Sequence, residues 1–245
     1  NEYARRVAQM GEEDWRICVS GAPGLDNMLQ IKAPTRGEVE DQFSIDLEQP
    51  ILLATYHPVT RSQTSGQNQL TYLLAAIEDL GVQVVFTYPN ADSGGRAMVS
   101  RIEEFQKRYV GARLVVNASQ EFYIGLMKYV SAMVGNSSSG IIESPSFKLP
   151  VVNIGTRQDG RTRAANVIDV GYVKNEIGQG IVRALSLEFG AGLADLTNPY
   201  GDGKAAGKIV DNLRRAELGD RLLRKRFRDQ PGLAQAGNPT VYDRE

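Results

Sequence analysis

Three consecutive serines form the segment of this sequence with the clearest capacity for chemistry. Ser137, Ser138 and Ser139 follow Asn136 and precede Gly140, between a short apolar run and a segment of helical character. The first backbone N–H groups of a helix lack partners inside it, and with the helix dipole they favour a bound phosphate. Serine hydroxyls add donors, and a glycine lets an anion approach the backbone closely. The same residue types also favour an ordinary helix N-cap, so both interpretations stay open on these residues alone.

Charged side chains accompany the serines along the chain. Glu143 lies one turn into the expected helix, where its carboxylate could accept two hydrogen bonds from a ribose diol. Arg157, Arg161 and Arg163 follow the next apolar run, and guanidinium groups suit the geometry of phosphates. They could equally pair with acidic groups across a domain boundary, or form a solvated charged surface. Their nearness to the serines favours an anion site.

His57 is the only histidine of the chain, and it directly follows an apolar run. Imidazole titrates near neutral pH, so His57 could contact a phosphate or handle a proton, although a lone histidine often has a structural role. Tyr123 could stack on a nucleobase or wall it off, or it could be a core residue on a helix face. Residues 90–96 form a polar loop that suits a ligand or a turn. The glycine-rich signatures of nucleotide triphosphatases and NAD-binding folds do not follow the predicted strands.

The composition excludes several function classes. Lys and Arg total 28 against 29 acidic residues, so no basic field favours nucleic acid. No run of ~18 apolar residues predicts a membrane span, and the first residues lack the apolar core of a signal peptide. Cys18, the only cysteine, rules out an internal disulfide and a cysteine-based zinc site, and we expect a buried thiol in a β-like run at residues 15–19. We expect a cytoplasmic protein without a metal or cofactor.

Short apolar runs alternate with amphipathic helical patterns from residue 51 onward. Strands are predicted at residues 51–56, 82–87, 113–117, 132–135, 151–154 and 167–170. Helices are predicted at residues 68–80, 95–109, 122–131 and 139–147. Strands separated by helices need crossover connections, which favours an α/β fold with a Rossmann-like, doubly wound parallel sheet. Ligands of such sheets bind beyond the carboxyl ends of the strands, where the serines, the arginines and His57 all lie.

The two ends of the chain have a different organisation. Residues 1–34 begin with a helical pattern and a strand-like run that read like the middle of a fold, so we expect an incomplete chain whose opening belongs to a neighbouring unit. Residues 21–24 and 33–48 have the composition of a linker. A long helix is predicted over residues 202–228, and a frayed tail over residues 231–245.

Several stretches, in this order, resemble one enzyme family. They are Gly21-Ala-Pro-Gly-Leu-Asp26, Thr55-Tyr-His-Pro58, Tyr88-Pro-Asn-Ala-Asp92, Gly135-Asn-Ser-Ser-Ser-Gly-Ile-Ile-Glu143, Asn153-Ile-Gly-Thr-Arg-Gln158 with Gly160-Arg161, Asn166-Val167 and Asn198-Pro-Tyr-Gly-Asp-Gly203. Together they are similar to the hydrolysing UDP-N-acetylglucosamine 2-epimerases, including members from the sialic-acid and legionaminic-acid pathways. The similarity covers nearly all of residues 1–230. The serine stretch and the stretch after Asn153 are fairly specific for the subgroup that releases free sugar and UDP.

The resemblance implies a GT-B-type enzyme with two Rossmann-like domains that face a cleft. Residues 1–34 would be a remnant of the first domain, residues 35–203 the UDP-binding second domain, and residues 204–230 a helix that crosses back. The UDP-binding residues that it implies are Tyr123, Asn136, Ser137, Ser138, Glu143, Arg157 and Arg161. Within this set the serines would bind the diphosphate, Glu143 the ribose, and Tyr123 would lie by the uracil. His57 matches the active-site histidine near the diphosphate.

The implied reaction eliminates UDP across C1 and C2 of the sugar to leave a glycal, and water then adds to give the 2-epimer. The carboxylate bases of this family belong to the first domain, so the chain is expected to be the UDP-binding half of the enzyme. The implied partners are UDP, UDP-N-acetylglucosamine or a related UDP-diacetamido sugar, the first domain, and a second copy in a homodimer. A GT-B glycosyltransferase and a UDP-sugar-binding module without catalysis remain the alternatives.

Overall fold

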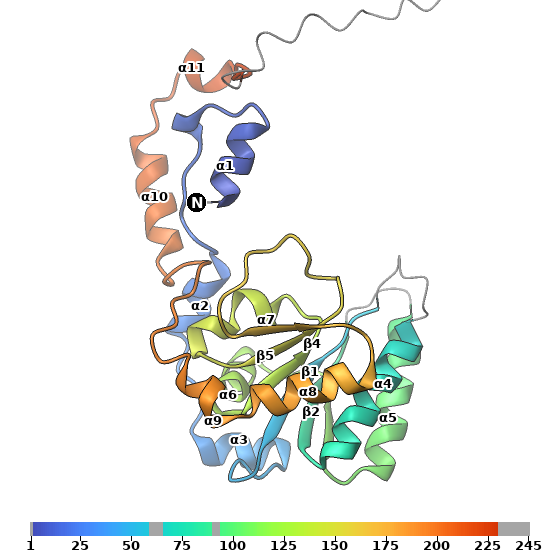
Figure 1. The fold of residues 1–245 in the computed structure, drawn as a ribbon. Coiled ribbons are helices and arrows are strands. Elements are labelled where there is room, and N and C mark those ends of the chain that lie inside the picture. The colour runs from blue at the N-terminus through green and yellow to red at the C-terminus, as the bar shows by residue number, and fades with distance from the viewer. Residues whose placement is uncertain (1, 59–65, 90–93, 230–245) are drawn as a thin grey trace, which may run out of the picture.

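A computed structural model describes residues 2–58, 66–89 and 94–229 of the chain (Figure 1). Residues 90–93 of the predicted polar loop and the whole predicted tail at residues 231–245 lie outside the described residues.

Six parallel strands form one sheet in the order β3-β2-β1-β4-β5-β6. Their bounds are β1 Ile51–Thr55, β2 Gln83–Thr87, β3 Ala112–Val115, β4 Ala132–Gly135, β5 Val151–Ile154 and β6 Val167–Val170. Every neighbouring pair in the sheet runs parallel. The structure therefore confirms the predicted α/β fold with a doubly wound parallel sheet.

Helices cover both faces of the sheet (Figure 1). One face packs against α4 (Gly66–Leu80), α5 (Gly95–Arg108) and α8 (Lys174–Ala184). The other face packs against α3 (Arg36–Phe43), α6 (Gln120–Tyr129), α7 (Ser139–Ile142) and the 3-10 helix η2 (Ser144–Phe147).

The central strand β1 is buried on both sides, which explains its uninterrupted apolar sequence. Leu52 and Ala54 belong to the core under α4, α5 and α8, whereas Ile51 and Leu53 belong to the core on the opposite face. This alternation follows from the two-residue period of a strand. Full burial of a leucine or isoleucine side chain contributes about 1.5–3 kcal/mol, so the strand is stabilised from both layers.

The predicted helix over residues 139–147 is two short helices, α7 and η2. Pro145 lies at the start of η2 and has no backbone N–H, so the α-helical ladder cannot continue through it. The Ser144 hydroxyl donates to the carbonyl of Gly140 at 2.7 Å, so a side chain supplies the partner of that carbonyl at the end of α7.

The segment before α3 differs from its prediction. It contains α1 (Glu2–Gln9), the 3-10 helix η1 (Asp14–Arg16) and α2 (Gly24–Gln30), and no strand forms within residues 15–19. Cys18 is exposed, so the expectation of a buried thiol is wrong. A strand needs a neighbour for its backbone groups, and no described strand pairs with this run.

Helices also occupy the predicted linkers. Gly24 already begins α2, and α3 lies within residues 33–48. A capping box starts α3, because the Glu38 N–H donates to the Thr35 hydroxyl and the Glu38 carboxylate accepts from the Thr35 N–H. The linker prediction missed this Thr-x-x-Glu signal.

The predicted long helix over residues 202–228 is also wrong. The chain forms α9 (Leu187–Ala191), then α10 (Ala205–Arg215) and a separate α11 (Asp220–Leu223). Ala216 is extended, and so is Gly219, which has a low helix propensity. Helices α10 and α11 lie with α1 beyond α2, away from the sheet (Figure 1). Among the described residues, no helix has the length and apolar character required to cross a membrane.

Candidate functional site

The site lies where β1 and β4 end side by side, at the point where the strand order of the sheet reverses. Gly135 ends β4 with a φ of 135°, and a Cβ added there would lie 2.0 Å from the Thr55 carbonyl oxygen. Only glycine tolerates both this backbone conformation and this approach. The chain can therefore turn from β4 into the serine segment while it stays in contact with the end of β1.

Asn136 joins the two strand ends through its side chain. Its Oδ1 accepts a hydrogen bond from the backbone N–H of His57 at 2.7 Å, and its Nδ2 donates to the His57 carbonyl at 2.9 Å. Asn136 is fully buried and His57 is 6% exposed. The amide thus imitates a neighbouring strand and fixes His57 at the carboxyl end of β1.

Two side chains from the loop after β5 converge on the same asparagine. Arg157 Nη1 and Gln158 Nε2 donate to the carbonyl oxygen of Asn136 at 3.0 and 2.8 Å. The structure therefore brings three of the predicted site residues together, namely His57, Asn136 and Arg157. Gln158 was not predicted as a site residue, although it ends one of the stretches that carried the family resemblance.

The serine segment combines features of a helix N-cap with features of an anion site. Ser137 and Ser138 are half-buried, and α7 begins at Ser139. The Ser139 N–H donates to the Ser137 hydroxyl at 3.3 Å, whereas the Ser138 side chain makes no capping bond. One serine thus acts locally on the backbone, and the structure leaves the phosphate role of this pair a prediction.

Tyr123 supports the serine segment from α6. Its hydroxyl donates to the Ser139 hydroxyl at 2.8 Å, and its ring packs against the core on that face of the sheet. Burial raises the pKa of Tyr123 to about 12, the hydrogen bond with Ser139 opposes this shift, and the charge of Glu143 adds to it. The core contact agrees with the alternative interpretation of Tyr123, and its placement by a nucleobase stays a prediction.

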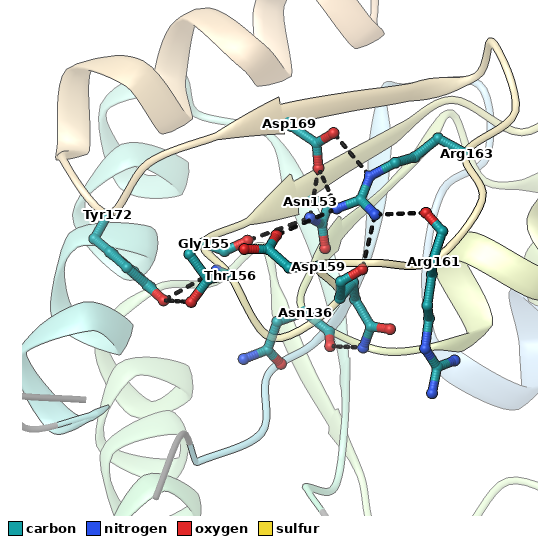
Figure 2. Close-up of polar contacts among 10 residues, drawn as sticks. Asn136, Asn153, Gly155, Thr156, Asp159, Arg161, Arg163, Asp169 and Tyr172 are labelled. Atoms are coloured by element: carbon teal, nitrogen blue, oxygen red, sulfur yellow. Dashed lines mark hydrogen bonds and ion pairs between the residues drawn. The ribbon is translucent and has the colours of Figure 1, made fainter. Parts of the chain in front are cut away.

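The remaining predicted residues lie on either side of this centre. Glu143 is half-buried at the end of α7, close enough to Tyr123 for its charge to act on the phenol. Arg161 is exposed, and no hydrogen bond or ion pair joins its guanidinium to the residues drawn around it (Figure 2). Arg163 is engaged instead with Asp169, at 2.9 and 3.1 Å, in a partly exposed ion pair, so it is not a free cation.

Helix α1 touches the loop that carries Arg157 and Arg161. The N–H of Thr162 donates to the Tyr3 hydroxyl at 3.0 Å, and the Tyr200 hydroxyl donates to the Thr162 carbonyl at 2.9 Å. Arg6 donates to the Gly160 carbonyl at 3.1 Å. The first helix of the chain therefore contacts one wall of the candidate site.

The donor set at this centre suits an anion. Side chains of arginine, serine, histidine and glutamine predominate, and these recognise phosphate oxygens through N–H and O–H groups. Within residues 2–58, 66–89 and 94–229, no group of three or more His, Cys, Asp and Glu side chains could hold a metal ion.

Comparison with known proteins identifies the family of this chain. The family model described as UDP-N-acetylglucosamine 2-epimerase matches residues 1–214. A UDP-N,N'-diacetylbacillosamine 2-epimerase (hydrolyzing) of Legionella pneumophila is 34% identical over 221 residues, which are 90% of this chain and 57% of that protein. A GDP/UDP-N,N'-diacetylbacillosamine 2-epimerase (hydrolyzing) of Campylobacter jejuni is 34% identical over 229 residues, 93% of this chain and 59% of that protein.

A solved structure shares the fold at lower identity. The crystal structure of UDP-GlcNAc 2-epimerase from Neisseria meningitidis bound to UDP-GlcNAc matches with a TM-score of 0.66 and 17% identity, over 88% of this chain and 59% of that one. The chain spans less than two thirds of the length of each of these three proteins. The match of the family model over most of the chain, supported by both curated relatives, shows that the chain belongs to the UDP-N-acetylglucosamine 2-epimerase family.

Proposed function

We propose that this chain is the UDP-binding part of a hydrolysing 2-epimerase that acts on UDP-N-acetylglucosamine or a UDP-diacetamido sugar. The observation that carries this proposal is the convergence of His57, Asn136 and Arg157 beside the serine segment, at the switch point of the sheet. Anionic ligands of doubly wound sheets bind at this position. The relatives named above supply the reaction class, since both are described as hydrolysing 2-epimerases.

Six of the predicted residues contact or flank UDP in the proposed complex. The hydroxyls of Ser137 and Ser138 and the guanidinium groups of Arg157 and Arg161 hold the diphosphate. Glu143 accepts from the ribose hydroxyls. In addition, Tyr123 lies on the side of the base, where it also holds Ser139 in place.

The proposed reaction has two steps. In the first, a base removes the proton from C2 of the sugar, the bond between C1 and the diphosphate oxygen breaks, and UDP departs with the electron pair. In the second, the oxygen of water adds to C1 of the glycal and a proton adds to C2. This proton arrives on the face opposite to the one from which the first proton was removed, which gives the free 2-epimer. Donors at the diphosphate stabilise the charge that develops on the leaving group, which is the contribution of this chain. We propose that the carboxylate bases come from the first domain, to which residues 1–34 would belong.

Calorimetric titration of this chain with UDP, uridine and ADP tests the binding half of the proposal. We expect UDP to bind more tightly than both comparisons, because uridine lacks the diphosphate and ADP carries another base. Absence of UDP binding, or equal affinity for UDP and uridine, would contradict the site.

An assay of a protein that joins this chain to the first domain tests the reaction. Free 2-epimeric sugar and UDP as products support the epimerase. A sugar transferred to an acceptor would instead identify a glycosyltransferase with the same nucleotide site.

A further inference from the structure

Arg163 organises the loop between β5 and β6 through several contacts at once. Its Nε and Nη2 atoms lie 2.9 and 3.1 Å from the two carboxylate oxygens of Asp169. Its Nη1 donates to the backbone carbonyls of Gln158 and Arg161 at 2.7 and 2.9 Å (Figure 2). A planar guanidinium can serve a carboxylate and two carbonyls together, whereas a lysine ammonium cannot span them. Arg163 therefore fixes the path of the loop and is not available as a phosphate ligand.

Asp169 anchors this arrangement to the sheet. It lies on β6, and its Oδ1 also accepts a hydrogen bond from Asn153 Nδ2 on the neighbouring strand β5 at 2.7 Å. Asn153 is 1% exposed, so one partner of the carboxylate is held rigidly inside the fold. The loop is thus tied at Arg163 to two strands of known register.

Gln158 is the residue through which this anchor reaches the candidate site. It is 1% exposed, its carbonyl accepts from Arg163, and its Nε2 donates to the Asn136 carbonyl at 2.8 Å. Its Oε1 is buried and finds no hydrogen-bond partner among the described residues. A buried acceptor without a donor costs about 1–3 kcal/mol. Such a glutamine is poorly suited to stabilise the fold, and its contacts with Arg163 and Asn136 are those of a residue that supports the site.

We propose that Arg163 and Asp169 are positioning residues for the diphosphate site. They hold Gln158, and with it Arg157, against the carbonyl of Asn136, whose amide fixes His57. The chain of contacts runs without interruption from the edge strand β6 to His57, which the family resemblance places near the diphosphate. The identity of the ligand rests on the proposed function, but the positioning itself is a property of the ligand-free chain.

The test compares Arg163→Gln and Asp169→Asn with wild type in two measurements. The first is the ring C–H signal of His57 in ligand-free NMR spectra, which is unambiguous because the chain has one histidine. The second is calorimetric affinity for UDP and for uridine. We expect both variants to move the His57 signal and to weaken UDP binding about tenfold, equivalent to about 1.4 kcal/mol, with little change for uridine.

A matched control and a conservative variant separate positioning from general damage. Arg108→Gln removes another arginine–carboxylate pair, with Glu78 between α5 and α4, and is expected to change neither measurement. Arg163→Lys keeps the charge but not the fork, so it should resemble Arg163→Gln and not restore binding. Thermal unfolding of each variant reports whether it is folded, and Asp169→Asn alone suffices if Arg163→Gln does not fold.

The possible outcomes lead to distinct conclusions. Wild-type UDP affinity together with an unmoved His57 signal in folded Asp169→Asn would overturn the positioning role, as would equal losses for UDP and uridine. If the wild-type chain binds no UDP, the proposed function fails. In that case the His57 signal alone decides. A His57 signal that moves in Arg163→Gln and Asp169→Asn but not in Arg108→Gln supports the positioning role. A His57 signal that stays in place in both variants overturns that role.

Discussion

Glu143 carries the part of the proposed UDP affinity that is simplest to isolate. Its carboxylate lies at the end of α7 and is proposed to accept from the ribose hydroxyls. Glu143→Ala should weaken UDP binding by roughly 1–3 kcal/mol, because hydrogen bonds to a charged acceptor contribute that much. Glu143→Gln keeps one acceptor oxygen and should lose less. Calorimetry measures both, and unchanged UDP affinity in a folded Glu143→Ala chain would rule out the ribose contact.

Tyr123 makes a prediction about alkaline pH. Burial raises its pKa to about 12 in the folded chain, whereas an unfolded tyrosine titrates near about 10. Between these values the unfolded chain releases a proton that the folded chain keeps, so stability falls as the pH rises. The contribution is complete below the unfolded pKa and is lost as the pH passes the folded one.

Between pH 8 and pH 11, the Tyr123→Phe chain should therefore lose about 1 kcal/mol less of its free energy of unfolding than the wild type loses. The measurement is the free energy of unfolding in denaturant at pH 8 and pH 11. Tyr72→Phe, at an exposed position of α4, is the matched control for the removal of a phenol hydroxyl. Equal pH dependence in wild type and Tyr123→Phe would show that the phenol ionises freely in the folded chain.

At the scale of elements, the turn from β4 into the serine segment depends on Gly135. Gly135→Ala should destabilise the chain by about 3 kcal/mol or more, since its Cβ would meet the Thr55 carbonyl and its φ would be strained. Gly178→Ala in α8 meets nothing within 4 Å and should stabilise by about 0.4–1 kcal/mol. Urea unfolding of the two variants checks the contrast, and a Gly135→Ala chain as stable as wild type would contradict the close packing of β1 and β4.

The elements differ in how far their sequences predicted them. β1 could be predicted, because burial on both faces produces a short apolar run with proline or polar residues at its ends. The run around Cys18 has the same local preference for a strand, but strand formation depends on a pairing partner elsewhere in the chain. The role of Arg163 was hidden for a similar reason. Its partner Asp169 lies on β6, and only the return path of the loop decides that the two side chains meet.

The predicted site residues illustrate the same limit. His57, Asn136 and Arg157 could be placed at one edge, because the carboxyl ends of parallel strands share it. Their mutual hydrogen bonds could not be foreseen, nor could the contribution of Gln158, which no spacing distinguishes from a surface glutamine. Positions at the sheet edge follow from topology, whereas contacts among them depend on side-chain packing.

At the scale of the whole molecule, the first and last described segments are joined to each other beside the site. The carboxylate of Asp26 on α2 accepts from the N–H groups of Ala205 and Ala206 at 2.9 and 2.6 Å, which caps the start of α10. The N–H of Ala22 donates to the Tyr200 carbonyl at 2.7 Å. Since Tyr200 also contacts Thr162 of the loop that carries Arg157, these segments and one wall of the site form a continuous set of contacts.

Asp26→Ala should release α10 from this set of contacts without disturbing the sheet. Loss of a capping carboxylate costs about 0.5–2 kcal/mol, and here it would also leave two backbone N–H groups unpaired, one of them buried. Amide hydrogen exchange should therefore accelerate within Ala205–Arg215 and stay unchanged in β1 and β4. Asp202→Ala is the matched control, because that exposed carboxylate accepts from Lys204 and Lys208 near the same helix end and should have a smaller effect. Faster exchange throughout the sheet in Asp26→Ala would show instead that α10 is part of one cooperative unit with the sheet, and unchanged exchange in α10 would show that the cap contributes nothing to its order.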